Sequence, residues 1–235
     1  MQNRFTVYQE EHVKRSTLII LALLLSALFC GTVHTRPALA AEPVHPLDCT
    51  KHCDSKAIPG RAQAMIGEPA PNFTLDAVVG SEFKIVSLAD YRGKWVVLFF
   101  YPLDFTFVCP TEIRGFNEKL DAFNKLNAVV LGASVDSQYS HLAWIKRGDL
   151  GDLKFPLLSD FKKEVAKRYG ILDEKEGVAL RGLFIIDPEG VLQYQLVHNL
   201  SVGRSVEETL RVLEALQTGE LCPLGWHPGQ KTLGK

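Results

Sequence analysis

Two apolar, β-branched runs separated by an amphipathic segment constrain the fold of this chain more than any other feature. The runs are KWVVLFFY (residues 94–101) and NAVVLGASVD (residues 127–136), and such continuous runs are typical of strands buried in the centre of a sheet. Between them, residues 111–126 carry apolar side chains at every third or fourth position, at Ile113, Phe116, Leu120, Phe123 and Leu126. This spacing predicts an amphipathic helix, and the alternation of strand and helix indicates an α/β fold.

Two further helices are predicted after the second strand. The first covers residues 137–147 and the second covers residues 159–170. The second has Ser159 or Asp160 as an N-cap and ends at Gly170.

The sequence of residues 181–219 predicts a hairpin and a last helix. Residues 181–199 contain two strands around a turn at 187–190. Residues 205–219 open with a Ser-x-x-Glu capping box and end at a glycine, and are therefore predicted to be helical. We expect a mixed central sheet flanked by helices on both faces, followed by an irregular tail rich in Pro and Gly.

The first 41 residues resemble a targeting segment. Lys14 and Arg15 precede an apolar block, Leu18–Cys30, that is shorter than the roughly 20 residues needed to cross a bilayer as a helix. Residues 38–40 (Ala-Leu-Ala) fit an A-x-A cleavage site. We predict a signal peptide and export to the periplasm or another extracytoplasmic compartment, with an uncleaved membrane anchor as the alternative.

Residues 42–60 are predicted to be a linker, and residues 61–235 to be one domain that includes the C-terminal tail. The linker contains Cys49 and Cys53. In an oxidising compartment these cysteines favour a local or intersubunit disulfide, with an electron relay to Cys222 as an alternative. A zinc site formed with the nearby histidines (His45, His52) is disfavoured, because adjacent His52 and Cys53 fit a tetrahedron poorly.

Composition excludes several classes of partner. The formal net charge of −1 provides no basic surplus that would attract nucleic acid or anionic membranes. No phosphate-binding loop and no Rossmann glycine pattern is present in the sequence, and we predict no cofactor and no metal. Contact with a membrane is expected only through an uncleaved N-terminal segment.

Cys109 lies where the first buried strand and a short loop meet the start of the first helix. Pro110 follows it, and proline is favoured in the first helical turn. The sulfur would therefore lie near free N–H groups and the positive end of the helix dipole, which favour a thiolate. An inert packed cysteine is the alternative in an apolar run. In the preceding loop, Thr106 is a candidate to donate a hydrogen bond to the sulfur and Pro102 a candidate to shield it from water, and ordinary loop chemistry is the alternative for each residue.

The stretch FYPLDFTFVCPTE contains P-x-x-x-T-x-x-C at residues 102–109 and resembles the active-site signature of peroxiredoxins. The resemblance extends over residues 61–235 through GEPAPNF, LGASVDS, FPLLSD, RGLFIID, VGRSVEETLR and CPLGWHPG. It is closest to the typical two-cysteine branch. This resemblance implies a thioredoxin-like fold and a thiol peroxidase that reduces hydrogen peroxide and organic hydroperoxides in antioxidant defence. It also implies a homodimer or a larger ring such as a decamer, and a thiol reductant such as thioredoxin.

The resemblance also implies roles for individual residues. Cys109 matches the peroxidatic cysteine, which attacks the O–O bond and becomes a sulfenic acid. Thr106 and Arg181 match the residues that bind the thiolate and the peroxide oxygens, and Pro102 matches the proline that walls the pocket. Glu112 matches the acid that organises the surrounding network, although a carboxylate in a first helical turn has a capping role as well.

Cys222, in ELCPLGW, matches the resolving cysteine, which in the family comes from the partner subunit and condenses with the sulfenic acid. A permanent structural disulfide to Cys49 or Cys53 is the alternative. For a Cys109–Cys222 bond the two Cα atoms must lie within about 7 Å. The start of the helix must therefore open and the tail must move.

Two features depart from the family pattern. Residues 148–151 read Gly-Asp-Leu-Gly instead of Gly-Gly-Leu-Gly, and no Tyr-Phe follows Trp226. We expect easier local unfolding around Cys109 and an enzyme that resists overoxidation.

Two other functions are alternatives. A thioredoxin-like disulfide oxidoreductase would need C-x-x-C where this sequence has Thr106-Phe-Val-Cys109. A chaperone-like ring assembly would suppress aggregation without needing Cys109.

Overall fold

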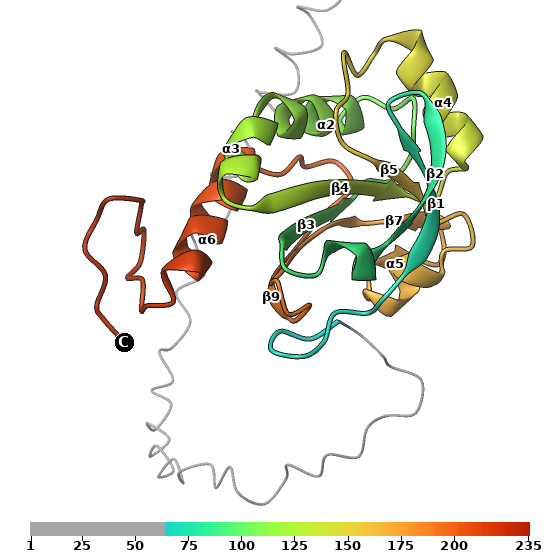
Figure 1. Ribbon diagram of the computed structural model, residues 1–235. Coiled ribbons are helices and arrows are strands. Elements are labelled where there is room, and N and C mark those ends of the chain that lie inside the picture. The colour runs from blue at the N-terminus through green and yellow to red at the C-terminus, as the bar shows by residue number, and fades with distance from the viewer. Residues whose placement is uncertain (1–63) are drawn as a thin grey trace, which may run out of the picture. The chain divides into compact units, whose positions relative to one another are not determined.

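The computed structural model describes residues 64–235 and shows a mixed sheet between helices (Figure 1). The main sheet contains β1 (Thr74–Val79), β2 (Glu82–Ser87), β3 (Trp95–Phe100), β4 (Ala128–Ser134), β5 (Leu157–Ser159), β8 (Arg181–Ile186) and β9 (Leu192–His198). A small second sheet pairs β6 (Leu172–Asp173) with β7 (Val178–Ala179). The helices are η1 (Leu88–Tyr91), α2 (Cys109–Glu118), α3 (Leu120–Lys125), α4 (Gln138–Arg147), α5 (Glu164–Arg168) and α6 (Val206–Thr218).

The strand order of the main sheet is β2-β1-β5-β4-β3-β8-β9. The three central strands β5, β4 and β3 are parallel to one another, and the remaining pairs are antiparallel. Both predicted central strands are confirmed as β3 and β4, which pair in register from Trp95 with Ala128 to Phe100 with Ala133. The prediction of a mixed α/β sheet is therefore confirmed.

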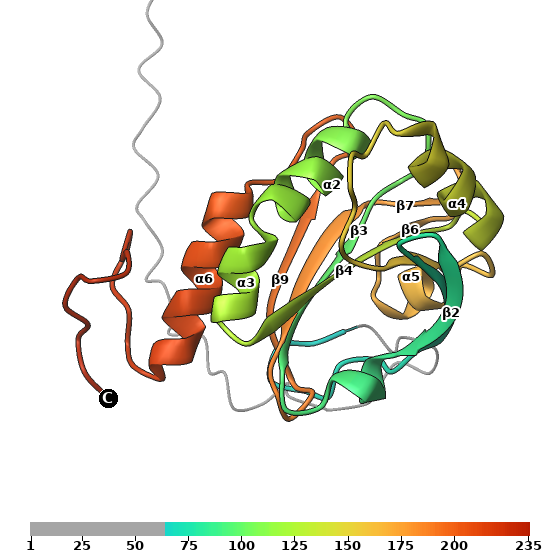
Figure 2. The ribbon, with the colours of Figure 1, turned by 45° about the horizontal axis from the view of Figure 1, so that its top comes forward.

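Helices cover both faces of the sheet, as expected. Figures 1 and 2 show α2, α3 and α6 together on one face and α5 on the other. Alternate residues of β3 supply the two cores: Val97 and Phe99 pack with Ile113 and Phe116 of α2, whereas Leu98 packs with the residues of α5. A strand buried on both faces in this way needs the continuous apolar run seen in the sequence.

The helix predicted over residues 111–126 differs from the observed structure in two ways. It begins earlier, with Cys109 as its first residue and Pro110 as its second. It is also divided into α2 and α3 at Lys119, whose backbone (φ −97, ψ 6) departs from helical geometry. The apolar face nevertheless continues across the break, since Phe116 and Phe123 are fully buried in the same core.

The predicted start of the helix over residues 159–170 is wrong, because the observed helix, α5, begins at Glu164. Ser159 belongs to β5, and α5 begins only after Lys163, which has a left-handed backbone (φ 62). Asp160 still caps this helix, because its carboxylate accepts hydrogen bonds from the amides of Val165 (3.1 Å) and Ala166 (2.7 Å). The predicted role of Asp160 as a cap is therefore confirmed, although residues 161–163 separate it from the first residue of the helix.

The remaining predicted elements are confirmed. The hairpin forms as β8 and β9, and the last helix forms as α6 with the Ser205 side chain accepting from the amide of Glu208. α4 is capped in the same way by Ser137. The tail after Thr218 contains no helix or strand.

Several predictions concern residues outside the described part of the chain. They are the signal peptide or anchor (1–41), the linker (42–60), and the roles of Cys49 and Cys53; the domain boundaries also stay predictions. Within residues 64–235, no helix is both long enough and apolar enough to cross a membrane. No group of three or more His, Cys, Asp or Glu side chains in this part of the chain is arranged to hold a metal ion.

Candidate active site

Cys109 is the first residue of α2 and is completely buried. The preceding residue, Val108, is helical in its backbone and makes no side-chain cap. The free N–H groups of this first turn therefore have no side-chain cap from Val108, and the positive end of the helix dipole lies beside the sulfur. The predicted position of Cys109 at a helix start is confirmed, and its sulfur is a free thiol.

Arg181, the first residue of β8, brings a positive charge to this sulfur. Its Nη1 donates to Cys109 Sγ at 3.5 Å and to Glu112 Oε2 at 2.6 Å, while its Nε donates to the carbonyl oxygen of Leu200 at 2.8 Å. Within residues 64–235 no hydrogen-bond acceptor contacts its Nη2. Because the guanidinium is 3% exposed and always charged, it stabilises negative charge on the sulfur and on an oxygen bound next to it.

Glu112 holds the two arginines of the site together. Its Oε1 accepts from the amide (2.9 Å) and Nε (2.7 Å) of Arg204, and its Oε2 accepts from Nη2 of Arg204 (2.9 Å) as well as from Arg181. Burial alone would raise the pKa of Glu112, but the hydrogen bonds and charge of Arg204 and the charge of Arg181 hold it below its ordinary value. The carboxylate therefore stays ionised and fixes both guanidinium groups.

Arg204 is a functional residue that the sequence analysis did not identify. Its Nη1 donates to the carbonyl oxygens of Phe100 (2.8 Å) and Gly182 (2.7 Å), at the ends of β3 and β8, so the guanidinium is tied to the sheet itself. The sequence offers no local signal for this role, because an arginine that directly precedes an N-cap, here Ser205, is ordinarily exposed. Its carboxylate partner lies 92 residues earlier, which no local pattern reveals.

A cavity of about 240 Å³ opens onto the sulfur. Pro102, Thr106, Cys109 and Arg181 all line it, together with Phe107, Val108 and Leu200. The structure thus brings together the predicted residues Pro102, Thr106, Cys109, Glu112 and Arg181. One detail differs, because the Thr106 hydroxyl donates to the carbonyl oxygen of Leu103 (2.9 Å) and not to the sulfur. Its lone pairs remain available to accept a hydrogen bond.

Cys222 is not part of this cavity. It lies in the tail after α6, where its sulfur contacts the hydroxyl of Thr218 at 3.5 Å and the carbonyl oxygen of Ala215 at 3.8 Å. Figure 1 shows this tail, in red, extending beyond the C-terminal end of α6. Cys222 is a half-buried free thiol, so within residues 64–235 the two cysteines are unpaired.

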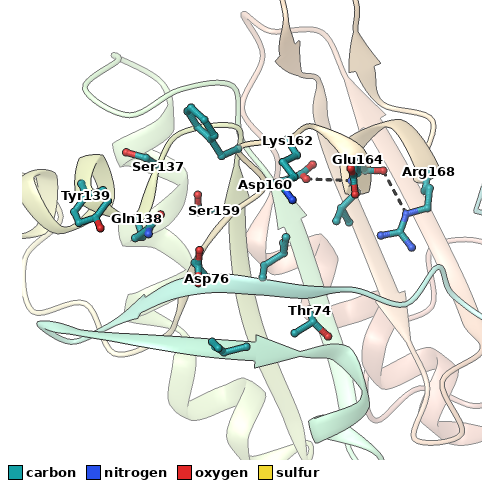
Figure 3. A pocket seen from close by; sticks show the side chains of 14 residues that line it. Thr74, Asp76, Ser137, Gln138, Tyr139, Ser159, Asp160, Lys162, Glu164 and Arg168 are labelled. Carbon is teal, nitrogen blue, oxygen red and sulfur yellow. Dashed lines mark hydrogen bonds between the residues drawn. The ribbon is translucent and has the colours of Figure 1, made fainter.

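A larger cavity of about 630 Å³ lies between the β1–β2 hairpin and the starts of α4 and α5 (Figure 3). Its labelled side chains include Asp76, Tyr139 and Arg168. None of the predicted site residues lines it. A buried sulfur and a buried guanidinium meet instead at the smaller cavity, which is therefore the candidate active site.

Comparison with known proteins identifies the family of this chain. Residues 66–195 match the model of the AhpC/TSA family. Over 180 residues the chain is 55% identical to Peroxiredoxin-1 of Gallus gallus, covering 73% of this chain and 90% of that protein. Over 178 residues it is 54% identical to the chloroplastic 2-Cys peroxiredoxin BAS1 of Hordeum vulgare, covering 72% of this chain and 85% of that protein.

Solved structures give the same result. The reduced 2-Cys peroxiredoxin of Plasmodium vivax superposes with a TM-score of 0.68 at 45% identity, covering 71% of this chain and 91% of that chain. The predicted thioredoxin-like fold is thereby confirmed. A buried cysteine at a helix start, beside a guanidinium with free donors, suits reduction of an O–O bond. The chain belongs to the AhpC/TSA family and is a peroxiredoxin, a thiol peroxidase that reduces hydroperoxides in antioxidant defence.

Proposed function

We propose that Cys109 is the peroxidatic cysteine of this enzyme and that Cys222 of a partner subunit resolves it. The Cys109 thiolate attacks the terminal oxygen of the hydroperoxide, so that an S–O bond forms and the O–O bond breaks. The leaving oxygen takes a proton and departs as water or an alcohol. The peroxide is reduced by two electrons and Cys109 is oxidised to a sulfenic acid.

The observation that carries this proposal is the position of Arg181. Its Nη1 donates to Cys109 Sγ at 3.5 Å, and its Nη2 donors have no partner within residues 64–235. These donors stabilise the charge that develops on the peroxide oxygens as the O–O bond breaks. Thr106 complements them, because its hydroxyl already donates to Leu103 and can only accept, as a peroxide O–H requires.

The resolving step joins the two cysteines. The Cys222 thiol attacks the sulfenic sulfur, an S–S bond forms, and the sulfenic oxygen leaves as water. Both sulfurs are free thiols here, and Cys222 lies on a tail outside the cavity. Relatives named 2-Cys peroxiredoxins support a cycle that uses two cysteines. We expect a homodimer in which each subunit supplies one cysteine to the other, with a decamer as the larger assembly.

The enzyme works outside the cytoplasm in this proposal. Support comes from the sequence of residues 1–41, with its basic residues, apolar block and A-x-A site. A thiol reductant returns two electrons to the Cys109–Cys222 disulfide, and a thioredoxin-like protein present in the same compartment fits this role. A fusion of residues 1–41 to a reporter enzyme active only after export tests the location.

The main experiment treats the reduced protein with one equivalent of hydrogen peroxide and then with an alkylating reagent. We expect rapid loss of peroxide and a disulfide-linked dimer on a non-reducing gel, with a Cys109–Cys222 peptide found by mass spectrometry. Cys222→Ser should stop at the sulfenic acid, and Cys109→Ser should leave the peroxide intact. A disulfide from Cys109 to Cys49 or Cys53, or slow consumption of peroxide, would contradict the proposal.

A further inference from the structure

The resolving step requires the loop before α2 to move. Cys109 is completely buried in the structure, so its sulfur cannot meet a sulfur from a tail until residues 103–108 and the residues of α2 that precede Glu112 leave their positions. The contacts that hold this loop therefore set the balance between resolution and further oxidation. This inference rests on the proposed roles of Cys109 and Cys222.

One contact of the loop is polar and fully buried. Asp104 accepts hydrogen bonds from the hydroxyls of Tyr101 (2.9 Å) and Ser140 (2.7 Å) and pairs with the Nδ1 of His141 (2.9 Å), while its own amide donates to Asp136 (2.9 Å). This network fastens the beginning of the loop to β4 and to the start of α4.

The second contact is made by Phe105, which directly follows Asp104. Its backbone is left-handed (φ 56), a conformation that is unfavourable for an aromatic residue. Its ring packs against Trp144 of α4 with ring centroids 5.7 Å apart, and the guanidinium carbon of Arg147 lies 5.6 Å from the centre of its ring. These two contacts hold Phe105 in its left-handed conformation. Without them we expect its backbone to relax to a more favourable conformation.

Asp149 fixes both partners of Phe105. One oxygen of its carboxylate, Oδ2, accepts from the indole Nε1 of Trp144 (3.0 Å) and pairs with Nε of Arg147 (3.1 Å). Trp144 is completely buried and shares the hydrophobic core with Cys109. Asp149 stands in the Gly-Asp-Leu-Gly stretch, at the position where the sequence departs from Gly-Gly-Leu-Gly, and a glycine there would have no side chain to make these contacts. At this residue we therefore expect the opposite of the easier local unfolding that the departure suggested from the sequence, and the expectation of easier unfolding now depends on the missing Tyr-Phe alone.

We propose that Asp149 is a positioning residue that holds the Cys109 loop closed through Trp144, Arg147 and Phe105, and thereby slows resolution relative to a chain without this carboxylate. Closing the loop keeps Cys109 beside Arg181 for reaction with peroxide. Opening the loop releases the left-handed Phe105 and exposes the sulfur to Cys222. The carboxylate stabilises only the closed state of the loop. It therefore lowers the rate of loop opening and leaves the chemistry of the pocket unchanged.

The expected size of the effect follows from the two contacts. A hydrogen bond to a charged acceptor is worth more than a neutral one, but the Asp149 side chain is 33% exposed and Arg147 is 63% exposed, so the pair with Arg147 adds little. We expect Asp149→Ala to accelerate formation of the Cys109–Cys222 disulfide by about threefold to tenfold. The reaction of Cys109 with peroxide should change by less than about twofold, because the closed loop remains the main state.

The test measures both steps on the full chain after rapid mixing of reduced protein with hydrogen peroxide. Peroxide loss reports the first step, and quenched samples analysed by mass spectrometry report disulfide and sulfinic acid on Cys109. Asp149→Ala should give more disulfide and less sulfinic acid at each peroxide concentration. Asp149→Asn, which keeps an acceptor for the indole, should lie close to wild type, and Asp152→Ala, which removes an exposed acid of the same loop, should match it.

The Phe105→Leu variant tests whether Asp149 acts through Phe105. In Phe105→Leu the ring that Trp144 and Arg147 hold is gone, so adding Asp149→Ala should have no further effect on resolution. An unchanged ratio of disulfide to sulfinic acid in Asp149→Ala would overturn the proposal, as would an equal effect in the Phe105→Leu background. If wild-type Cys109 forms neither sulfenic acid nor disulfide, the proposed roles of the two cysteines fail first, which this assay shows directly.

Discussion

Replacing Glu112 by glutamine should disable the active site while leaving its shape almost unchanged. Glu112 is the carboxylate that pairs with both Arg181 and Arg204, and all three side chains are at most 3% exposed. Glutamine has nearly the same volume, but its NH₂ group would face guanidinium donors. The substitution therefore tests charge and hydrogen bonding and not packing.

The structure allows the magnitude to be worked out. Removing one partner from a buried ion pair costs about 3–5 kcal/mol, because the remaining charge stays buried without compensation. For a domain of this size about 1 kcal/mol lowers Tm by roughly 2–4 °C, so a fall of roughly 6–20 °C is expected. Without the Glu112 carboxylate, Arg181 keeps only its Nε bond to the carbonyl oxygen of Leu200, so its Nη1 is held less firmly at 3.5 Å from Cys109 Sγ. Loss of one such donor typically slows a reaction by about 10²–10³-fold, and a displaced donor should cost about 10–100-fold.

Two assays on Glu112→Gln check these numbers. Differential scanning calorimetry gives Tm, and stopped-flow measurement of peroxide consumption at a temperature well below Tm gives the rate constant of Cys109 oxidation. Glu118→Gln is the matched control, since Glu118 is an exposed acid at the end of the same helix. If Glu112→Gln kept Tm within about 2 °C and the rate within about twofold of wild type, the reasoning would be refuted.

Three other predictions follow from the same region. Because the pKa of Glu112 is below its ordinary value of 4.5, its contribution to stability is present above that pH and is lost as pH falls below it; acid unfolding followed by circular dichroism should lose this component in Glu112→Gln. Gly182→Ala should cost about 1–3 kcal/mol in urea unfolding, since the new Cβ would lie 2.8 Å from Ile171 Cδ1. Ser205→Ala removes the cap on the amide of Glu208 and should cost about 1 kcal/mol in the same assay, with little change in peroxidase rate.

Elements with strong local signals were predicted from the sequence, and those defined by distant contacts were not. The buried strands β3 and β4 carry β-branched runs, and α4 and α6 carry a serine N-cap and a terminal glycine. β5 has only three residues, and its position between β1 and β4 depends on pairing that no local pattern specifies. The delayed start of α5 depends on the left-handed backbone of Lys163, a residue type with no preference for that conformation.

The candidate site divides in the same way. Cys109, Pro102 and Thr106 lie within eight residues, so one motif identifies them together. Arg204 was not predicted, because an arginine before a helix N-cap is ordinarily a surface residue. Only the fold brings its side chain to Glu112. The proposed role of Asp149 also could not be predicted from the sequence, since it depends on the indole Nε1 of Trp144 donating to the Asp149 carboxylate beyond the end of α4.

The two proposed steps of the cycle require opposite states at the start of α2. The start of the helix must be folded for Cys109 to react with peroxide and open for Cys109 to meet Cys222. Cys109 begins the first turn of α2, which has no side-chain cap from Val108, whereas Glu112, three residues later, is joined to Arg204. Arg204 is in turn anchored to the carbonyl oxygens of Phe100 and Gly182. Unwinding past Glu112 would separate the buried ion pairs and cost several kcal/mol, but unwinding the residues before it breaks no such pair. In the proposed cycle, we therefore expect the opening that delivers Cys109 to Cys222 to stop at Glu112, which would keep the two arginines in place for the next peroxide.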